Sequence, residues 1–516
     1  MTESGLPRDQ DRIGHVHVDD VGGKARRGAM WSAVQIVIRN VVSIGVTAVL
    51  ARLLVPEDYG LIGMVATLTA LLQVFSDMGL SWATVQRRDL THAQVSSLFW
   101  VNIAAGVVLW GAMIAAAPFL AAFYGEPALT MITIVSGVGF AISGVAVQPM
   151  ALLMRRMDFR RIAGIEITAL LVGAIVALAL ALSDAGYWAL VAQGPMQAIV
   201  RAILSIRGTG IRLQAPRRTV GLGSLVSFGG LLAVNGLLIY LARNLDSVMI
   251  GKVWGAAELG IYNRAYFLML LPSMLANGVL SGLMVTSLAA FQGDRDRFAQ
   301  AYRKALRLVA YAGTPMALGL ALTAAPAVEL IYGPGWEQVV ALLVWLSFAA
   351  ITQPVYNTNG WLFTAAGRGG TYLILTAVNT GLLGLVFLLT VQHGIQTLAQ
   401  GYGLVMGLII PLPALWLAHR AARIPFMPSL RSIFPIFLLN GVMGLMVWGT
   451  WLVAGAAGWS RMAAFPAQVG VGVISYLILT PLLLRDMMRQ DIAPVLSGIR
   501  NRFLAASDRT QNPAEQ

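Results

Sequence analysis

Long apolar runs separated by short polar breaks follow one another along almost the whole chain. Each run is close to the roughly 20 residues that an α-helix needs to cross the hydrocarbon core of a membrane. The pattern predicts an all-α integral membrane protein with about fourteen transmembrane helices. The expected spans are residues 30–52, 60–78, 96–120, 128–150, 163–182, 186–206, 224–248, 260–288, 305–330, 338–360, 371–391, 397–417, 432–455 and 465–484.

The composition agrees with a lipid environment and removes several kinds of chemistry. Of 516 residues, 57% are hydrophobic and 11% are charged, whereas soluble domains have about 25% charged residues. Cysteine is absent, which excludes a disulfide framework, a cysteine-ligated zinc site and a thiol nucleophile. We expect no cofactor and no metal site.

Lys and Arg are distributed unevenly between alternate connections. From a cytoplasmic N-terminus, the basic connections at 87–88, 155–161, 207–218 and 295–307 all fall on the side of that terminus. Cytoplasmic loops carry such an excess, so both termini are predicted to be cytoplasmic, with the chain in the cytoplasmic (inner) membrane. The net charge of +13 is then explained by orientation and by contact with membrane lipids, with no nucleic acid involved.

The lengths of the connections fix the expected domain organisation, because none is long enough to hold a folded soluble domain. We expect a disordered cytoplasmic tail at 1–28, a first six-helix bundle at 29–206, a cytoplasmic linker at 207–223, a second six-helix bundle at 224–418, two additional C-terminal helices at 419–484 and a cytoplasmic tail at 485–516.

Three short motifs of the first half have echoes in the second half, in the same order. Ala51–Leu54 resembles Ala242–Leu245, Asp58–Leu61 resembles Glu258–Ile261, and Phe123–Glu126 resembles Ile331–Pro334. The offsets of 191, 200 and 208 residues rise steadily, as small insertions would make them. Since each offset covers six spans, the two copies keep one orientation. This is the parallel-repeat arrangement of transporters, whose substrate site lies between the halves near the bilayer midplane.

The first predicted helix carries a polar stripe at membrane depth. Arg39 lies 13 residues before Arg52, which places it about 20 Å deeper along a helix. Asn40 borders the stripe. An arginine at this depth predicts a water-filled cavity, although a snorkelling or carboxylate-paired arginine is the alternative. The side chains that recur every four residues are Gln35, Arg39, Ser43 and Thr47.

The seventh predicted helix repeats this combination of amide and charge. Asn235 and Asp246 are 11 residues apart and fall within about 20° of each other around a helix, with Arg243 about 80° away. A plain ion pair between Arg243 and Asp246 explains the pattern equally well. Another stripe runs along the sixth helix, and several single amides at membrane depth are more typical of helix packing than of ligand binding. These are Gln193, Gln197 and Arg201 in the stripe, and Asn102, Gln148, Asn277, Asn357, Asn379 and Asn440 among the amides.

A set of motifs is spread over residues 25–485. The motifs are Leu50–Leu61, Asp77–Leu80 followed by Val85–Arg88, Arg156–Phe159, Asn244–Gly251 and Tyr332–Trp336. Together they resemble the polysaccharide exporters of the Wzx type, which belong to the MOP superfamily with the multidrug MATE antiporters and the lipid II flippases. This resemblance implies two six-helix bundles plus two helices. It also implies flipping of an undecaprenyl-pyrophosphate-linked oligosaccharide from the cytoplasmic to the periplasmic leaflet.

The implied substrate assigns roles to the candidate residues. A guanidinium binds phosphate oxygens in a forked geometry, so Arg39 is expected to contact the pyrophosphate, with Arg52 and Arg243 nearer the outer mouth. Asp246 and Asp77 are candidates for gating or ion coupling. The expected partners are the lipid-linked oligosaccharide, membrane lipids, and polysaccharide polymerase and co-polymerase proteins. The remaining candidates for substrate binding are Gln35, Asn40 and Asn235.

Two other functions stay open at this point. A MATE-type cation-coupled drug antiporter shares the implied fold but is expected to place a carboxylate in its cavity, for which Asp77, Glu166 and Asp246 are available. A membrane-embedded polysaccharide polymerase or glycosyltransferase needs converging acid/base groups. The five histidines are scattered and the predicted outer loops are short, which favours a transporter over an enzyme.

Overall fold

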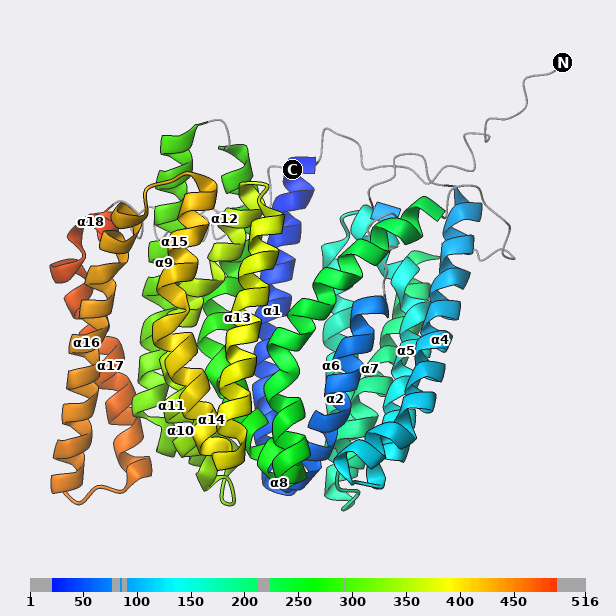
Figure 1. The fold of residues 1–516 in the computed structure, drawn as a ribbon, viewed down its shortest axis with the longest axis horizontal. Helices are drawn as coiled ribbons and strands as arrows, with labels where there is room; N and C mark the ends of the chain where they lie inside the picture. The colour runs from blue at the N-terminus through cyan, green and yellow to red at the C-terminus, as the bar shows by residue number, and fades with distance from the viewer. Residues whose placement is uncertain (1–20, 77–83, 86–90, 211–222, 292–293, 490–516) are drawn as a thin grey trace, which may run out of the picture. The chain divides into compact units, whose positions relative to one another are not determined.

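The computed structural model describes residues 21–76, 84–85, 91–210, 223–291 and 294–489, and helices joined by short turns make up nearly all of them (Figure 1). The predicted all-α architecture is confirmed. Within these residues, eleven helices are long and apolar enough to cross a membrane. The chain is therefore a multi-pass membrane protein, and a total of fourteen spans stays a prediction.

The helices of the first half follow the predicted apolar runs and extend beyond several of them. α4 begins with a capping box, in which Thr91 and Gln94 satisfy each other's backbone N–H groups, and it ends at Gly125 in the left-handed conformation. Both ends are thus set by local sequence. The bounds are α1 Val21–Leu53, α2 Pro56–Ser76, α4 His92–Tyr124, α5 Ala128–Arg155, α6 Phe159–Leu182 and α7 Trp188–Thr209.

The second half begins with α8, Gly223–Ala290, which joins two predicted spans. Its backbone is non-helical at Gly255, with φ 82° and ψ −172°, a conformation that glycine adopts without the strain of a Cβ. The remaining elements are α9 Arg295–Leu322, α10 Ala324–Tyr332, α11 Glu337–Asn357, α12 Asn359–Ala365, α13 Gly369–Thr390, η3 Val391–His393, α14 Ile395–Leu404, η4 Val405–Ile409, α15 Pro411–Ala422, α16 Phe426–Ala456, α17 Arg461–Leu483 and α18 Arg485–Met487.

The chain forms two compact units that do not coincide with the two sequence halves. Unit 1 contains residues 1–264, 331–336 and 380–395, and unit 2 contains 265–330, 337–379 and 396–516. In unit 1, α4 packs along α5, α7 packs on α5 and α6, and α1 packs on α6. In unit 2, α9 packs on α11 and α16, and α16 packs on α17. The predicted division into bundles at 206 and 224 stays a prediction.

Candidate functional site

Two helix ends from different sequence halves meet in unit 1 through backbone contacts that mirror each other. α2 begins at Pro56, directly after α1, and α8 resumes after its break at Gly255. A Cβ on Gly60 would overlap the carbonyl oxygen of Ala256, and a Cβ on Gly260 would overlap that of Pro56. Glycine at both positions lets the two backbones touch. We call this contact the reciprocal junction.

The reciprocity has the form expected for two related halves. Pro56 and Ala256 are 200 residues apart, and so are Gly60 and Gly260. When residue i touches j′ and residue i′ touches j, the interface is isologous and a two-fold relation connects its sides. The repeat inferred from the echo of Asp58–Leu61 in Glu258–Ile261 is thus visible as a packing relation.

Each helix end at the junction also contacts a segment at the same end of unit 1 from the other half. Lys252 donates to the carbonyl of Phe123 and lies over the Phe123 ring, 5.0 Å from its centroid. In the mirrored position, a Cβ on Gly333 would lie 3.2 Å from Cγ of Arg52. The second half therefore contacts the last turn of α4, and the first half contacts the loop between α10 and α11.

These contacts correct one pairing inferred from the sequence. The echo of Ala51–Leu54 in Ala242–Leu245 made Arg243 the counterpart of Arg52. In the structure, Arg52 ends α1, and the cation at the corresponding helix end is Lys252, three residues before the break in α8. The offset of 200 that aligns Gly60 with Gly260 also aligns Arg52 with Lys252, because no insertion separates the two positions.

An aromatic cluster fills the centre of the junction. Trp336, 1% exposed, donates from Nε1 to the carbonyl of Ala51 at 2.9 Å. The rings of Tyr59 and Tyr332 each lie with their centroids 5.4 Å from that of Trp336. Arg264 lies over Tyr59 at 4.4 Å, and Tyr332 donates to the Arg264 carbonyl. Segments far apart in sequence are thereby held at one end of unit 1.

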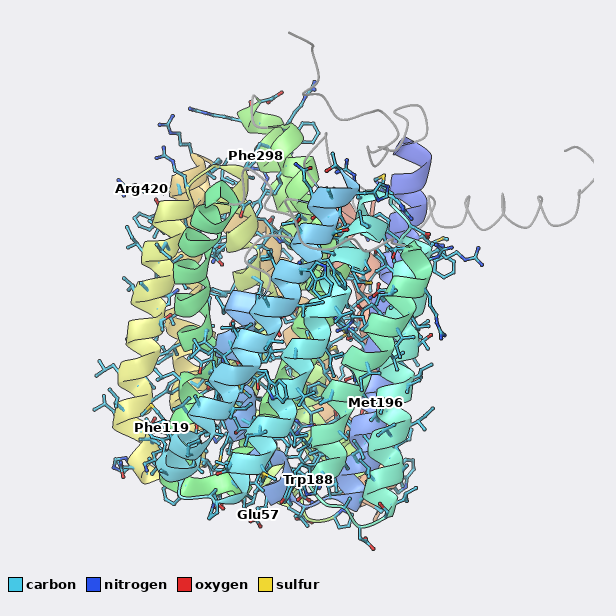
Figure 2. The ribbon with its side chains drawn as sticks, turned by 90° about the vertical axis from the view of Figure 1, so that its right-hand side faces the viewer. Glu57, Phe119, Trp188, Met196, Phe298 and Arg420 are labelled. Atoms are coloured by element: carbon cyan, nitrogen blue, oxygen red, sulfur yellow. The ribbon has the colours of Figure 1, made fainter. Side chains whose placement is uncertain are left out.

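The first turn of α2 is acidic, as a helix N-terminus favours. The Asp58 carboxylate accepts the Val55 N–H at 3.2 Å. Burial raises the pKa of Asp58, and hydrogen bonds from the backbone of Val55 and Tyr187 act in the opposite direction. Glu57 and Trp188 lie at the same end of unit 1, the lower end in Figure 2.

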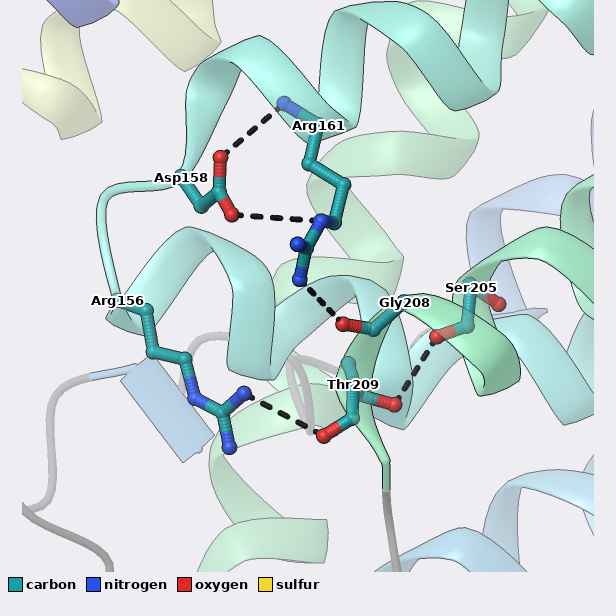
Figure 3. A network of polar contacts seen from close by, with 6 residues as sticks. All are labelled: Arg156, Asp158, Arg161, Ser205, Gly208 and Thr209. Carbon is teal, nitrogen blue, oxygen red and sulfur yellow. Dashed lines mark hydrogen bonds and ion pairs between the residues drawn. The ribbon is translucent and has the colours of Figure 1, made fainter.

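Arginines gather at the opposite end of unit 1, where α5, α6 and α7 end or begin (Figure 3). Arg161 donates to the Gly208 carbonyl at 2.6 Å and Arg156 to the Thr209 carbonyl at 3.4 Å. These carbonyls belong to the C-terminal turn of α7, whose dipole favours a cation. Asp158 caps α6 and pairs with Arg161 at 3.6 Å. The predicted cytoplasmic end thus holds ordered arginines.

Two adjoining, partly open cavities lie in unit 1; α2, α5 and α7 line both of them, and α4 and α6 also line the smaller one. Their volumes are about 420 and 330 Å³, and they share Gln73, Phe140, Ser143 and Arg201 as lining residues. In the smaller one, Arg201 forms a two-pronged ion pair with Glu166, with N–O distances of 2.8 and 2.9 Å. This pairing lowers the cost of keeping both side chains charged in an apolar part of the chain.

Unit 2 has a basic pocket of about 420 Å³ at the ends of its helices. Its wall contains Arg295, Arg368 and Arg423 together with Phe298. Phe298 and Arg420 lie at the same end of unit 2 in Figure 2. Because guanidinium groups bind phosphate oxygens, this pocket has the chemistry for an anionic headgroup.

The predicted polar stripe of α1 is present as a helical face. Arg39 is exposed on α1, and Gln35 and Asn40 are half-buried. Arg39 makes no hydrogen bond or ion pair with the residues that the structure describes. No carboxylate among these residues pairs with the Arg39 guanidinium. The role of Arg39, Gln35 and Asn40 in substrate binding stays a prediction.

Asp246 is enclosed within unit 1. It is 4% exposed and accepts hydrogen bonds from the Tyr262 hydroxyl at 2.8 Å and from the Ser247 N–H at 2.7 Å. Ser247 in turn contacts the side chain of Asn263 at 3.4 Å. These partners come from both sides of the break at Gly255, so the carboxylate ties the two parts of α8 together.

The other predicted site residues are placed only in part. Arg52 is exposed at the end of α1, beside the loop of Gly333. Asp77 lies outside the described residues, and so do the side chains of Asn235 and Arg243. The Arg243–Asp246 ion pair therefore stays a prediction.

Several single amides of unit 2 join helices, as expected. Asn357 donates to the Ser273 hydroxyl at 2.8 Å, Asn379 to the Tyr356 hydroxyl at 3.1 Å, and Asn440 to the Thr314 hydroxyl at 2.6 Å. In each case the amide nitrogen donates to a hydroxyl on a neighbouring helix, although the Asn440 side-chain oxygen has no partner among the described residues. These contacts are typical of amides that join helices.

The polar stripe of Gln193, Gln197 and Arg201 is detectable in the sequence, but the sequence alone does not assign it to a site. The missing information is the position of Glu166, 35 residues away, whose carboxylate meets Arg201 only because α6 packs against α7. Gln73 and Ser143 carried no signal, since isolated polar residues in an apolar run do not reveal which face they share.

The comparisons with known proteins decide the family. Residues 49–341, more than half of the chain, match the family described as "Polysaccharide biosynthesis protein". The chain belongs to that family. The resemblance to polysaccharide exporters drawn from the motifs is thereby confirmed.

Curated relatives carry names from the same area of biology. The chain is 25% identical over 464 residues to the teichuronic acid biosynthesis protein TuaB of Bacillus subtilis, covering 88% of the chain and 94% of the relative. It is 26% identical over 353 residues to the lipopolysaccharide biosynthesis protein WzxC of Escherichia coli, covering 67% and 70%. The succinoglycan biosynthesis transport protein ExoT of Rhizobium meliloti is 23% identical, with 86% and 90% covered.

Solved structures share the fold of this polysaccharide biosynthesis family member at low sequence identity. The lipid II flippase MurJ in an inward closed conformation aligns with a TM-score of 0.70 at 12% identity, covering 89% of the chain and all of MurJ. An inward-facing multidrug MATE transporter of the MOP superfamily aligns with a TM-score of 0.60 at 16% identity, covering 77% and 99%. The fold is therefore that of MOP superfamily transporters.

Proposed function

We propose that the chain is a flippase that moves an undecaprenyl-pyrophosphate-linked oligosaccharide repeat unit from the cytoplasmic to the periplasmic leaflet of the inner membrane. The product would serve exopolysaccharide, capsule or O-antigen synthesis. The family and the names of the relatives support the substrate class, and the transporter fold supports movement rather than chemistry. The chain acts as a transporter, not as an enzyme.

The reciprocal junction is the observation that carries the mechanism. Two related halves held together at one end of unit 1, opposite the arginine-rich end, form a closure that can part without breaking either half. With both termini in the cytoplasm, the junction lies on the periplasmic side. Alternating access then requires the junction to separate while the cytoplasmic end closes.

The negatively charged pyrophosphate needs a cationic side chain to bind it as it crosses the membrane, and we assign this role to Arg39. An exposed arginine on a spanning helix, with no described partner, is available to an anionic headgroup. Gln35 and Asn40 would hydrogen-bond the same group, with Asn235, Arg52 and Arg243 along the route. Asp246 and Asp77 are the groups we assign to gating or ion coupling. Polymerase and co-polymerase proteins would receive the product.

A drug antiporter with a free carboxylate finds less support in the described residues. Two of the three carboxylates considered for it are engaged, Glu166 by Arg201 and Asp246 by Tyr262 and Ser247, and the third, Asp77, lies outside the described residues. A cationic drug would have to displace these partners. Arg201 in particular would repel it.

Deletion of the gene tests the proposed function. The flippase account expects lipid-linked repeat unit to accumulate on the cytoplasmic face of the membrane, at the mass of one unit. In liposomes, the purified protein should move that unit across without changing its mass. Failure to accumulate the unit, or its lengthening by the purified protein, would overturn the proposal.

A further inference from the structure

The smaller cavity of unit 1 contains an amide whose hydrogen bonds are unmade. Asn102, on α4, is 1% exposed and lines the cavity, and neither its side-chain nitrogen nor its side-chain oxygen has a partner among the described residues. Leaving such a group unpaired in a buried place costs roughly 1–3 kcal/mol. Because Asn102 faces the cavity, a ligand bound there would supply the hydrogen-bond partners that the protein does not.

The charges of the cavity restrict what that partner can be. Arg201 and Glu166 face each other at 2.8 Å, so their formal charges cancel. A phosphate group entering the cavity would meet the Glu166 carboxylate, and a cation would meet the Arg201 guanidinium. A neutral ligand is opposed by neither group and can still hydrogen-bond both.

The remaining lining groups favour a ligand rich in hydroxyls. The Asn102 amide offers donors and an acceptor, Ser143 offers a hydroxyl that does both, and Gln73 adds a second amide. Alcohol groups are matched to such surroundings because each donates and accepts at once. The Phe140 ring, on the wall of both cavities, supplies an apolar surface for the C–H face of a ring.

We propose that this cavity is a subsite for a neutral monosaccharide. Its volume of about 330 Å³ lies at the lower end of the range for small-molecule sites, about 300–1,000 Å³, as suits a single sugar ring. Resting on the proposed function, the inference names one neutral sugar of the repeat unit as the natural occupant. It separates recognition of the sugar from recognition of the pyrophosphate, which is assigned to Arg39.

The cysteine-free chain makes a direct test available, because any introduced thiol is the sole one. Val147→Cys places a reporter on the cavity wall, and Ser183→Cys places one at the exposed end of α6 as a control. Glucose or galactose should slow maleimide labelling of the Val147→Cys variant by 1 + [sugar]/Kd, about fivefold at a concentration about four times Kd. Labelling of the Ser183→Cys variant should not change.

Two further substitutions, each combined with Val147→Cys, separate binding from packing. Asn102→Leu removes the unpaired amide, so it should abolish the protection by hexose while thermal stability holds or rises. Thr133→Val removes another buried hydroxyl that has no described partner but does not line either cavity, and protection should persist. Loss of stability in Asn102→Leu with protection intact would overturn the subsite.

Ions provide the opposing arms of the experiment. Inorganic phosphate or sodium chloride that protects the Val147→Cys thiol better than hexose does would make the cavity an ion site and refute the inference. Absence of protection by any neutral hexose would refute it as well, even if the purified protein flips its lipid-linked unit. If hexose protects the Val147→Cys thiol but the purified protein does not flip the lipid-linked unit, the proposed function is refuted and the sugar subsite is retained.

Discussion

At the scale of single residues, the charged groups in the apolar part of the chain divide into satisfied and available ones. Asp246 and Glu166 have close partners, whereas Arg39 has none among the described residues. A satisfied buried charge stabilises a particular packing, and an available one can bind a ligand. This difference could not be predicted from sequence, where Arg39 and Asp246 looked alike.

Replacing Arg39 tests its assignment to the pyrophosphate. Arg39→Ala and Arg39→Gln remove the charge, and we expect each to lower the initial rate of flipping by at least about tenfold, equivalent to about 1.4 kcal/mol. Arg39→Lys keeps the charge but loses the forked geometry, so an intermediate rate is expected. The measurement is transport of lipid-linked unit into liposomes at equal protein abundance.

Arg207, exposed in the last turn of α7 at the predicted cytoplasmic end, is a matched control for Arg39. Arg207→Gln should transport at close to the wild-type rate. If all three Arg39 variants do the same, the pyrophosphate contact lies elsewhere.

The hydrogen bond between Tyr262 and Asp246 makes a second residue-scale prediction. Tyr262→Phe removes one of the hydrogen bonds to the buried carboxylate, and we expect a loss on the order of 1–3 kcal/mol in the free energy of unfolding. Thermal unfolding in detergent measures it. Tyr59→Phe is the control, since the buried Tyr59 hydroxyl has no partner among the described residues. Equal effects from the two substitutions would argue against the Tyr262–Asp246 bond.

At the scale of elements, apolar run length predicted most helices, because a long apolar segment in lipid must satisfy its own backbone hydrogen bonds. The ends were harder. α9 begins at Arg295, ten residues before the predicted span at 305, since Asp294 caps a polar turn that hydropathy alone leaves out. The repeat was detectable at Gly60 and Gly260, while the alignment of Arg52 with Lys252 needed the packing contacts.

The junction glycines give the prediction at this scale. Gly60→Ala and Gly260→Ala each push a methyl group into an opposing backbone carbonyl, and each should destabilise the protein by about 1–3 kcal/mol, as overpacking does. Either added methyl group separates the same two backbones. The double variant should therefore lose less free energy of unfolding than the sum of the two single losses. Thermal unfolding of the three variants measures this.

Gly111→Ala on α4 is the control for the junction glycines, since a Cβ there meets nothing within 4 Å. That substitution should be neutral or stabilising. Additive losses at Gly60 and Gly260, or losses no larger than at Gly111, would contradict the reciprocal junction.

At the scale of the whole molecule, the sequence was sufficient for the fold class and the family, because composition and motif order are properties of the chain itself. The sequence could not identify the smaller cavity of unit 1, which depends on how Asn102, Glu166 and Arg201 from three different helices converge. Nor could it show that Trp336 reaches back to Ala51 across 285 positions. Both features depend on long-range packing.

In the proposed mechanism the reciprocal junction opens in each transport cycle, and a reversible cross-link across it shows whether flipping needs that opening. Phe123→Cys and Lys252→Cys place two accessible thiols at contacting positions in an otherwise cysteine-free chain. A reducible bifunctional thiol reagent should stop flipping in the double variant, and reduction should restore it. Each single-cysteine variant should be unaffected by the reagent. Undiminished flipping with the cross-link fully formed would contradict the account.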